Sequence, residues 1–493
     1  MVNIMEAKYK FWFYIGSQPL YGSDILNQVE EHGRIMTESF NADQTIPFQI
    51  VFKGVGTTTN KITSLCKDVN KSKTCTGLIT WMHTFSPSKM WIRGLSILNK
   101  PYLHLNTQFN RNIPFQTIDM NFMNTNQSAH GDREHGFITA RLRLKRKVIC
   151  GYWKDKSMRA RIAIWMRAAI GAQFSRDLKV ARFGDNMRYV AVTEGDKVQA
   201  EKDLGWSVNT YALEDLLQKF NQIERGQIEE KLEEYQSKYH INKEDWESIK
   251  YQAKLELAIL EMQKELKFLA YTDCFQDLGG LEQLPGLAVQ NLMSQGIGFG
   301  AEGDWKTAAL QAIMGEMSKD LGGHLSFIED YTYHLEEGNE AVLGAHMLEI
   351  SPAIAQNKPK IEVHQLSIGD KRNPARLVFE GREGPAILAT IIDMGGRFRL
   401  IVHDIAAISP MEDMPKLPTA RVMWKLQPDM ITGNEAWIYS GGAHHSVISY
   451  DLTAEHMKDF ATIMGIECIH IGKDSTLDNL QNKLLINDII WNR

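Results

Sequence analysis

The chain has 493 residues, of which 43% are hydrophobic and 23% charged, a composition typical of globular proteins and unlike that of disordered chains. At ~150 residues per domain, this length predicts about three domains. The formal net charge of -5 argues against nucleic acid as a partner, because binding a phosphate backbone needs a basic surface. No stretch approaches the ~18 apolar residues of a membrane span, and the five scattered cysteines form no paired motif, so we expect a soluble, cytoplasmic protein without a membrane partner.

The first part of the chain, from about residue 10 to 185, alternates short apolar runs with amphipathic segments. We expect strands at FWFYI, QIVFKGV, GLITWM and PYLHLN, and helices near 24–40, 60–70 and 88–98. This alternation predicts βαβ units around a parallel sheet, and such sheets bind ligands at the carboxyl ends of their strands. The segment Gly16-Ser17-Gln18 follows FWFYI directly and should lie at that edge. A second α/β region is predicted to begin at KVICGYW and to continue at LKVARFGDNM.

Two later regions have different patterns. Residues 206–270 combine helical spacing with dense charges of both signs, which predicts solvated helices. Beyond about residue 360, apolar and polar residues alternate with period two between glycine-rich turns, in the runs ARLVFEG, PAILATIIDMG and RFRLIVHDIAAI. This second pattern predicts an antiparallel sheet or a small barrel.

The segment GIGFGAEGDWKTAAL contains Gly298, Gly300 and Gly303 in the spacing G-x-G-x-x-G. A dinucleotide site would need a strand leading into this motif, whereas the preceding LPGLAVQNLMSQG has helical spacing and a glycine stop. Glycines that simply turn the chain are the plain alternative. We favour a turn that brings the backbone close to a ligand and aims Glu302 into a cleft, with Asp304 placed to cap the following helix.

Carboxylates and imidazoles recur in three later segments. Glu329 lies in FIEDYTYH, His346 lies in LGAHMLEISP, and the pair His444-His445 follows two glycines. Taken singly, each is more typical of a buried hydrogen-bond partner or a packed histidine than of a catalyst. Together with Glu302, they offer a donor set that suits a borderline divalent cation such as Mn²⁺ or Co²⁺. The spacing alone is too open to be diagnostic.

The adjacent histidines permit a sharper inference, because neighbouring side chains on a strand point to opposite faces. If the segment is extended, only one of His444 and His445 can ligate a metal, and the other forms a nearby hydrogen bond or reaches a ligand from the flank. Alternatively, the pair caps a turn. Two further clusters, HTFSP (83–87) and NQSAHGDREHGF (126–137), are either functional loops or solvated salt-bridge loops. The chain contains no G-x-S-x-G motif, so no Ser-His-Asp nucleophile stands out.

Several long and uncommon strings carry a resemblance to a known family. They are FWFYIGSQPLYG (11–22), WMHTFSPSKMWI (81–92), LHLNTQFNRNIP (103–114), DMNFMNTNQSAHGDRE (119–134), KVARFGDNMR (179–188), VTEGDK (192–197), GFGAEGDWKTAAL (298–310), FIEDYTYH (327–334), LGAHMLEISP (343–352), MPKLP (414–418) and SGGAHHSV (440–447). In this order, the strings resemble the L-arabinose isomerase family nearly from end to end.

The resemblance implies a fold and an assembly. The fold is the three-part α/β architecture of the fucose and arabinose isomerases, with two α/β domains on parallel sheets at 1–174 and 175–325. A C-terminal antiparallel β-barrel domain follows at 326–493. The implied assembly is a homohexamer with active sites near subunit interfaces.

The resemblance also implies site residues, carried over position by position. It makes Glu302, Glu329, His346 and His445 the ligands of a catalytic Mn²⁺, for which Co²⁺ can substitute, and it places His444 beside the substrate. Phe85 and His130 are implied to come from a neighbouring subunit. The full set of further implied sugar contacts is Gln18, Leu20, Phe85, His130, Met187, Phe275 and Ile368. We expect Asp304, behind Glu302, to orient that glutamate.

The implied activity is an aldose–ketose isomerase that converts L-arabinose to L-ribulose and converts D-galactose slowly to D-tagatose. This reaction moves a proton between C1 and C2 through an enediol, so a metal would stabilise developing charge while Glu302 and Glu329 shuttle protons. Two alternatives stay open. One is a ketol isomerase of the fucose type with the same fold and metal, and the other is a non-catalytic sugar-binding homologue.

Three positions depart from the family pattern. Pro19 stands where relatives often have histidine, and it stiffens the loop beside Gln18 while removing a donor. Ala301 replaces a glycine, which matters only if that residue needs a positive φ. Asp370 replaces another glycine and adds a negative charge near Ile368. All three spare the implied ligands, so they bear on substrate preference more than on reaction type.

Overall fold

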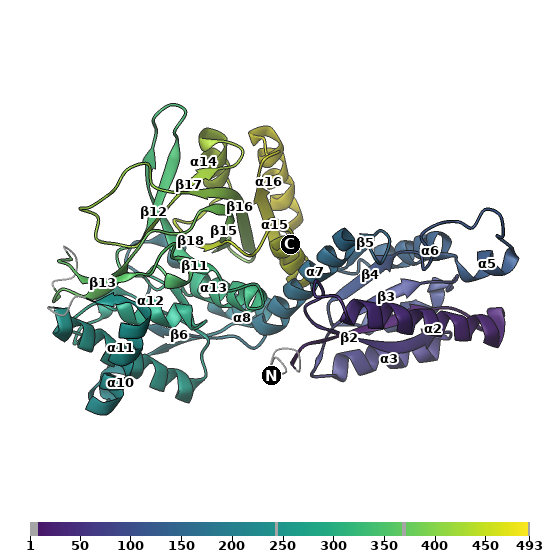
Figure 1. Cartoon of the computed structure of the whole chain (residues 1–493), viewed down its shortest axis with the longest axis horizontal. Coiled ribbons are helices and arrows are strands. Elements are labelled where there is room, and N and C mark those ends of the chain that lie inside the picture. Colours follow the sequence, from purple (N-terminus) through teal and green to yellow (C-terminus); the bar gives the residue numbers. More distant parts are fainter. Residues whose placement is uncertain (1–7, 242–244, 367–370, 492–493) are drawn as a thin grey trace. The chain divides into compact units, whose positions relative to one another are not determined.

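The structure is a computed structural model that describes residues 8–241, 245–366 and 371–491 (Figure 1). The chain forms two compact units, Met1–Gln173 and Phe174–Arg493. Ile368 and Asp370 lie outside the described residues. The three-domain division with boundaries at 174 and 325 stays a prediction.

The first unit is built on a five-stranded parallel sheet in the order β2-β1-β3-β4-β5. The predicted alternation of strands and helices is confirmed, with one correction. The segment KVICGYW supplies β5, which pairs with β4 and therefore belongs to this first sheet, not to a second α/β region. The strands are β1 (Lys10–Gly16), β2 (Gln49–Gly56), β3 (Cys75–Met82), β4 (Tyr102–Asn106) and β5 (Lys147–Cys150).

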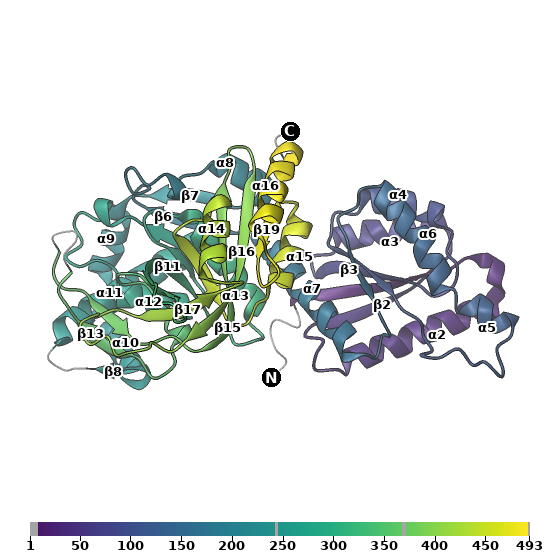
Figure 2. The same ribbon diagram turned by 90° about the horizontal axis from the view of Figure 1, so that it is seen from above.

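Helices cover both faces of this sheet, with α3 and α4 on one side and α2 and α7 on the other (Figure 2). Aromatic side chains fill both layers. Phe11 packs against Trp165 of α7, whereas Tyr14, on the opposite face of the strand, packs against Trp91. The helices are η1 (Pro19–Tyr21), α2 (Gly22–Asn41), α3 (Thr59–Lys71), η2 (Ser88–Trp91), α4 (Ile92–Ile97), α5 (Met120–Thr125), α6 (Ser128–Arg141) and α7 (Lys156–Ser175).

The second unit begins with a four-stranded parallel sheet in the order β10-β9-β6-β7. Its strands are β6 (Lys179–Phe183), β7 (Ser207–Tyr211), β9 (Ala270–Asp273) and β10 (Gly298–Gly300). Its helices are η3 (Ala191–Thr193), α8 (Lys197–Leu204), α9 (Leu213–Gln222), α10 (Arg225–Lys238), α11 (Trp246–Leu266), η5 (Phe275–Asp277), α12 (Leu287–Ser294) and α13 (Trp305–Ser318). Two parallel-sheet α/β regions are therefore present, as the sequence predicted.

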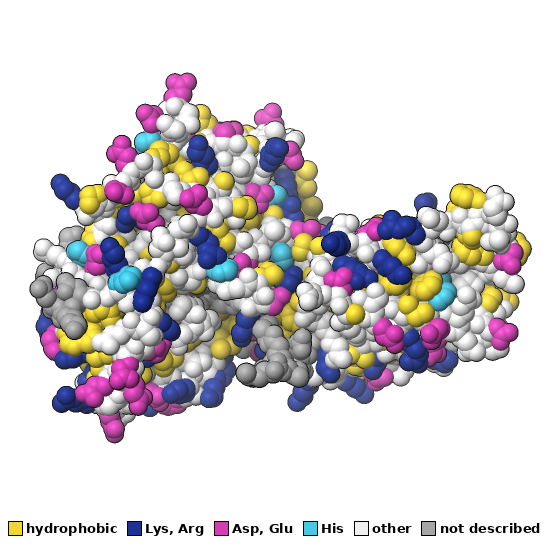
Figure 3. Space-filling view, in the orientation of Figure 1, with side chains coloured by type: hydrophobic (Ala, Val, Ile, Leu, Met, Phe, Trp, Pro, Cys, Tyr) yellow, Lys and Arg dark blue, Asp and Glu magenta, His cyan; other side chains and the backbone are white. Residues whose placement is uncertain are grey.

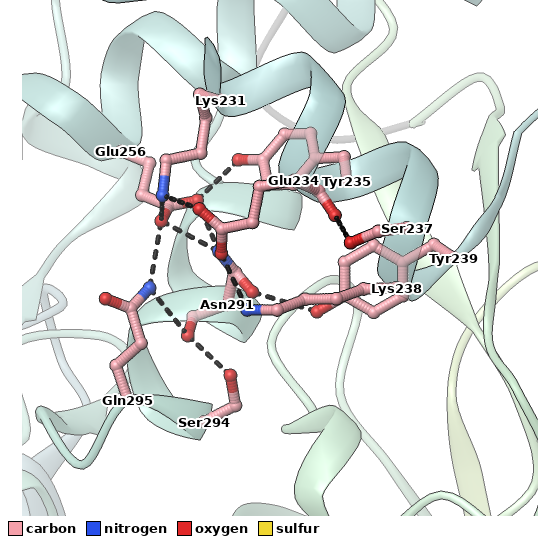
Figure 4. A network of polar contacts seen from close by, with 10 residues as sticks. All are labelled: Lys231, Glu234, Tyr235, Ser237, Lys238, Tyr239, Glu256, Asn291, Ser294 and Gln295. Carbon is pink, nitrogen blue, oxygen red and sulfur yellow. Dashed lines mark hydrogen bonds and ion pairs between the residues drawn. The ribbon is translucent and has the colours of Figure 1, made fainter.

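The charged segment 206–270 is mostly helical, but the expectation that its helices are simply solvated is wrong at one place. Glu256 of α11 is fully buried and accepts hydrogen bonds from Lys231 Nζ at 2.9 Å and Asn291 Nδ2 at 2.8 Å (Figure 4). The Tyr235 hydroxyl and Gln295 Nε2 at 2.9 Å donate to the same carboxylate. This network fixes α10 and α12 against α11.

A seven-stranded mixed sheet completes the second unit, in the order β15-β18-β11-β12-β17-β16-β19. Every pairing is antiparallel except that of β16 with β19. β15 pairs with both β18 and β16, the double pairing that a barrel needs, while a closed barrel stays a prediction. The strands are β11 (Leu325–His334), β12 (Ala341–Ala345), β15 (Gly384–Asp393), β16 (Phe398–Ile408), β17 (Arg421–Leu426), β18 (His445–Ser449) and β19 (Glu467–Ile471).

The remaining elements are a small sheet and the C-terminal helices. The sheet has the order β14-β13-β8, formed by β8 (His240–Ile241), β13 (Lys360–Val363) and β14 (Ala375–Val378). The helices are η6 (Pro352–Ile354), α14 (Met430–Tyr439), α15 (Ala454–Met464) and α16 (Leu477–Trp491). Within the described part of the chain, no helix has both the length and the apolar character that crossing a membrane requires.

Candidate metal centre

Glu302 lies in the tight connection between β10 and α13. Glycine is needed in the preceding strand, because a Cβ on Gly298 would lie 2.3 Å from the Ala308 carbonyl oxygen and one on Gly300 would lie 2.3 Å from that of Asp304. The strand β10 therefore lies pressed against α13, and Gly303, at a φ of 78°, makes the turn that follows. The predicted cap is confirmed, since the Asp304 side chain accepts from the Thr307 backbone N–H.

The backbone of Glu302 itself is strained. Its φ of 61° falls in the left-handed region, which costs a non-glycine residue on the order of 1 kcal/mol. Two backbone hydrogen bonds hold it there, from Met187 N to the Glu302 carbonyl and from Gly303 N to the Asp273 carbonyl, both 2.9 Å long. Because Glu302 and not Ala301 takes the positive φ, the alanine in place of the family glycine fits without strain.

Neighbouring strands of the mixed sheet bring the other predicted ligands together. On β11, Glu329 pairs with Ala345 of β12 on one side and with His445 of β18 on the other. His346 directly follows β12, so its imidazole lies at the same end of the sheet. His346 Nε2 lies 3.9 Å from Glu329 Oε2.

The two adjacent histidines both approach Glu302. The Nε2 atoms of His444 and His445 lie 3.7 and 3.8 Å from Glu302 Oε2. β18 begins only at His445, so strand alternation does not separate the two side chains as an extended segment would. One ligand atom from each of these three residues lies within 4.8 Å of the others. His445 is fully buried, whereas the His444 side chain is 35% exposed, which leaves His444 open toward a ligand.

Carboxylates behind the imidazoles fix their orientation. His445 Nδ1 lies 3.2 Å from Asp304 Oδ2, and His346 Nδ1 is hydrogen-bonded to Glu349. Each Nε2 is thereby free for a ligand, as in the carboxylate–histidine–metal arrangement. Asp304, expected to orient Glu302, lies against His445 and Thr307 instead.

The electrostatics of the cluster follow from burial and close charges. Burial opposes a charged imidazole, but the Glu349 carboxylate beside it raises the pKa of His346 to about 9. Burial would raise the pKa of Asp304, yet the Lys306 ammonium at 3.3 Å and His445 hold it well below its usual range. The pKa of Glu302 is likewise lowered against the effect of its burial, chiefly by His444 and His445. Glu302 and Asp304 are therefore ionised at neutral pH.

The donor set fits a divalent cation. Two carboxylates and several imidazoles are the ligands that a borderline ion such as Mn²⁺ or Co²⁺ accepts. His445 Nε2 is buried and has no hydrogen-bond partner among the described residues, which is unusual for an imidazole nitrogen in a protein interior. A cation between these side chains would satisfy it.

A pocket of about 260 Å³ opens beside the cluster. Glu302, Glu329 and His346 form its polar wall, and two of the predicted sugar contacts, Met187 and Phe275, line it as well. A cavity of this size with convergent carboxylates suits a small polar ligand such as a monosaccharide.

The four remaining described contact residues, Gln18, Leu20, Phe85 and His130, lie in the first compact unit. Gln18 and Leu20 follow β1, and Phe85 follows β3, the strand next to β1 in the sheet. The rings of Phe85 and His130 stack with centroids 4.5 Å apart. The residues that follow β1 and β3 lie at the carboxyl edge of the sheet, where the strand order changes direction. This is the usual ligand position in parallel α/β sheets.

Sequence reasoning missed two buried acids near the cluster. Glu349 orients His346, and its position three residues after the histidine in LGAHMLEISP was the available signal. Asp273 ends β9, and its burial, reinforced by Glu349, raises its pKa to about 8. Nothing in its sequence context, AYTDCF, marked it as unusual.

Comparisons with known proteins cover nearly the whole chain. Family models described as the N-terminal, central and C-terminal domains of L-arabinose isomerase match residues 5–177, 179–320 and 324–467. The chain belongs to the L-arabinose isomerase family. It is 53% identical over 489 residues to the L-arabinose isomerase of Geobacillus kaustophilus (strain HTA426), covering 98% of both chains. It is 51% identical over 493 residues to that of Thermotoga petrophila (strain ATCC BAA-488 / DSM 13995 / JCM 10881 / RKU-1), covering 100% of this chain and 99% of the relative.

Membership in the L-arabinose isomerase family confirms the resemblance inferred from the motifs. It also makes the chain an enzyme, an isomerase that interconverts an aldose and a ketose.

Proposed function

We propose that this enzyme converts L-arabinose to L-ribulose at the cluster of Glu302, Glu329, His346, His444 and His445. The observation that carries the proposal is the convergence of two glutamates and a buried, unpartnered imidazole nitrogen beside a pocket of about 260 Å³. The names of relatives more than 50% identical over nearly the full length supply the substrate.

Glu302, Glu329, His346 and His445 are proposed to hold a divalent cation, Mn²⁺ or in its place Co²⁺. When bound, such a cation supplies Lewis-acid stabilisation of charge on the sugar oxygens. The carboxylates of Asp304 and Glu349 keep the two imidazoles in the orientation that ligation needs. The backbone hydrogen bonds that hold Glu302 at a positive φ fix the direction in which its side chain leaves the backbone, which limits the reorganisation needed during turnover.

The proton transfers are assigned to Glu302 and Glu329. The reaction removes a proton from one carbon of the C1–C2 pair and returns it to the other, through an enediol. A carboxylate on the pocket wall can accept and return that proton, while the second serves the hydroxyl groups. The Glu302 carboxylate raises the pKa of His444, which favours its protonated form and allows it to donate to a sugar oxygen.

Substrate contacts are proposed for Met187 and Phe275 on the pocket wall, and for Gln18, Leu20, Phe85 and His130 in the first unit. A homohexamer in which a neighbouring subunit supplies Phe85 and His130, a cytoplasmic location, and side activity from D-galactose to D-tagatose all stay predictions.

The experiment is ketose formation from L-arabinose, D-galactose and L-fucose by chelator-treated protein, with and without Mn²⁺, Co²⁺ or Mg²⁺. We expect L-ribulose production restored by Mn²⁺, together with a Mn²⁺-dependent rise in melting temperature, because a ligand at a hundred times its Kd stabilises by about 2.7 kcal/mol. A preference for L-fucose would indicate a fucose-type enzyme. Sugar binding without isomerisation by any metal-loaded, folded sample would indicate a non-catalytic homologue.

A further inference from the structure

A second pocket, of about 640 Å³, lies in the first compact unit at the carboxyl ends of β4 and β5. Asn106 and Gln108 line it after β4, Tyr152 lines it after β5, and Asp132 and Arg133 of α6 complete it. The four proposed sugar contacts of this unit do not line it, although one of them, His130, directly follows the lining residue Ala129; they are Gln18, Leu20, Phe85 and His130. The pocket therefore opens at the carboxyl edge of the sheet, the edge at which parallel α/β sheets bind ligands, but away from the point between β1 and β3 where the strand order changes direction.

The surroundings of this pocket are strongly basic. The segment 141–147, RLRLKRK, carries five Lys and Arg residues and no acid, and it leads from α6 into β5. Lys and Arg side chains gather over β5 and toward α6 in Figure 3. A cluster of one sign of charge beside a hollow raises the local concentration of ligands of opposite charge.

Two arginines in the pocket have uncommitted donors. Arg133 is exposed and makes no ion pair within the described residues. Arg146 donates through Nη1 to the Leu144 carbonyl at 3.3 Å, but its buried Nε has no hydrogen-bond partner in the described part of the chain. Arg111, also on the wall, is by contrast paired with Asp155.

The single carboxylate on the pocket wall does not neutralise these arginines. Asp132 is buried, and its two oxygens accept from His104 Nε2 at 2.8 Å and from Asn106 Nδ2. The buried His104 is in turn held by the Thr80 hydroxyl, 3.0 Å from its Nδ1. This part of the wall is therefore fixed by internal hydrogen bonds, which lowers the entropy lost when a ligand binds.

We propose that this pocket binds a small phosphorylated sugar or polyol. Arg133 and Arg146 would receive the phosphate, because guanidinium groups donate paired, charge-assisted hydrogen bonds to phosphate oxygens. The neutral amides of Gln108 and Asn110 on the same wall would serve hydroxyl groups.

Calorimetric titration of the metal-free, full-length protein with ribose 5-phosphate, inorganic phosphate and ribose tests the proposal. We expect ribose 5-phosphate to bind most tightly, inorganic phosphate more weakly and ribose not at all. Arg133→Gln should weaken ribose 5-phosphate binding at least about tenfold, because it removes a charged donor to the phosphate oxygens. The substitution should leave the fold intact, since Arg133 is exposed. Arg93→Gln, the same change at an exposed position of α4 outside both the pocket and the basic segment, should leave binding unchanged.

Absence of ribose 5-phosphate binding, or binding that Arg133→Gln leaves intact, would overturn the proposal. Equal binding of ribose would also overturn it, because recognition would then not depend on phosphate. None of these titrations requires turnover or a metal, so they succeed or fail independently of the proposed isomerase site.

Discussion

Two carboxylates of the second unit, the fully buried Glu256 and the half-buried Glu302, have opposite surroundings. Glu256 receives donors from Lys231, Tyr235, Asn291 and Gln295, so the protein satisfies it completely (Figure 4). Glu302 faces imidazole nitrogens at 3.7 and 3.8 Å, beyond hydrogen-bond length, and one of them has no partner among the described residues. A network that is complete without a ligand stabilises the fold, whereas one left incomplete is prepared for a ligand.

The largest effect expected from this comparison is on turnover at the incomplete cluster. Glu302→Gln and Glu329→Gln should each lower kcat by about a thousandfold or more, because they remove a proton-transfer group and a charged ligand. Glu337→Gln, at an exposed position in the β11–β12 connection, is the matched control. Near-normal kcat in either site variant, measured on purified folded protein, would refute the paired proton-transfer roles.

The complete network should affect stability instead. Lys231→Met should lower the free energy of unfolding by about 3 kcal/mol, because it leaves the Glu256 carboxylate buried without its ammonium partner. Denaturant titration measures this loss, and kcat per folded enzyme should stay unchanged. Lys238→Met, on the same helix but partly exposed, should change stability by less than about 1 kcal/mol. A large loss of kcat in folded Lys231→Met protein would break the distinction between the two clusters.

The proposed role of the carboxylates behind the imidazoles, which is to orient them for metal binding, can be tested by measuring metal affinity. Asp304→Asn should weaken Mn²⁺ binding about 10- to 100-fold, because an amide orients His445 less well than a carboxylate. Asparagine still caps α13, but the buried Lys306 ammonium loses its carboxylate partner, so the melting temperature without metal should fall and the titration is made on protein shown to be folded. Asp429→Asn, which alters the cap of α14, is the control for a general capping effect. Calorimetric Mn²⁺ titrations that give equal affinities for Asp304→Asn and the unmodified protein would contradict this role.

The smallest expected effect is the acid sensitivity of a satisfied buried histidine. Burial lowers the pKa of His403 to about 4, against the opposing effect of its 2.7 Å hydrogen bond to the Gln427 carbonyl. The unfolded chain therefore binds more protons than the folded one between pH 6.5 and 4, and stability falls as the pH falls through that window. At pH 5.5 the loss from this group is about 1.4 kcal/mol.

Denaturant titrations at pH 7 and pH 5.5 measure how much the free energy of unfolding falls on acidification. His403→Gln, which keeps an N–H donor, should make this fall smaller by the contribution of the histidine. His240→Gln, at an exposed position, should leave the pH dependence as it is. An identical pH dependence in the His403 variant would show that this histidine does not titrate as its burial implies.

Most strands and helices could be predicted, because local period and turn residues determine them. FWFYI and GLITWM form buried strands, as their patterns predict. RFRLIVHDIAAI forms β16, but its burial alternates only from Asp404 onward, because its first half is buried on both faces. KVICGYW was misplaced because a strand's sequence does not reveal which sheet it joins. The burial of Lys231 and Glu256 was missed for a similar reason, since a charged helical face looks the same whether its partner is water or another helix.

The residues of the candidate cluster could be proposed from the sequence, whereas the residues that support them could not. Glu302 and His445 were identified from strings that resemble the family, yet Glu349 became visible only through its contact with His346. The positive φ of Glu302 was also not predictable, because glutamate has no preference for that conformation and surrounding hydrogen bonds impose it. The conformation of Glu302 depends on contacts between segments that are distant in the sequence, which a local pattern does not show.

The pairing of Glu329 with His445 also has a consequence for the order of folding. The two residues are separated by more than a hundred positions, so the cluster forms only through contacts of high sequence separation, which are late and slow to form. During synthesis, Glu302, Glu329 and His346 leave the ribosome well before β18. A growing chain therefore lacks the complete set of proposed metal ligands until most of the C-terminal sheet can assemble.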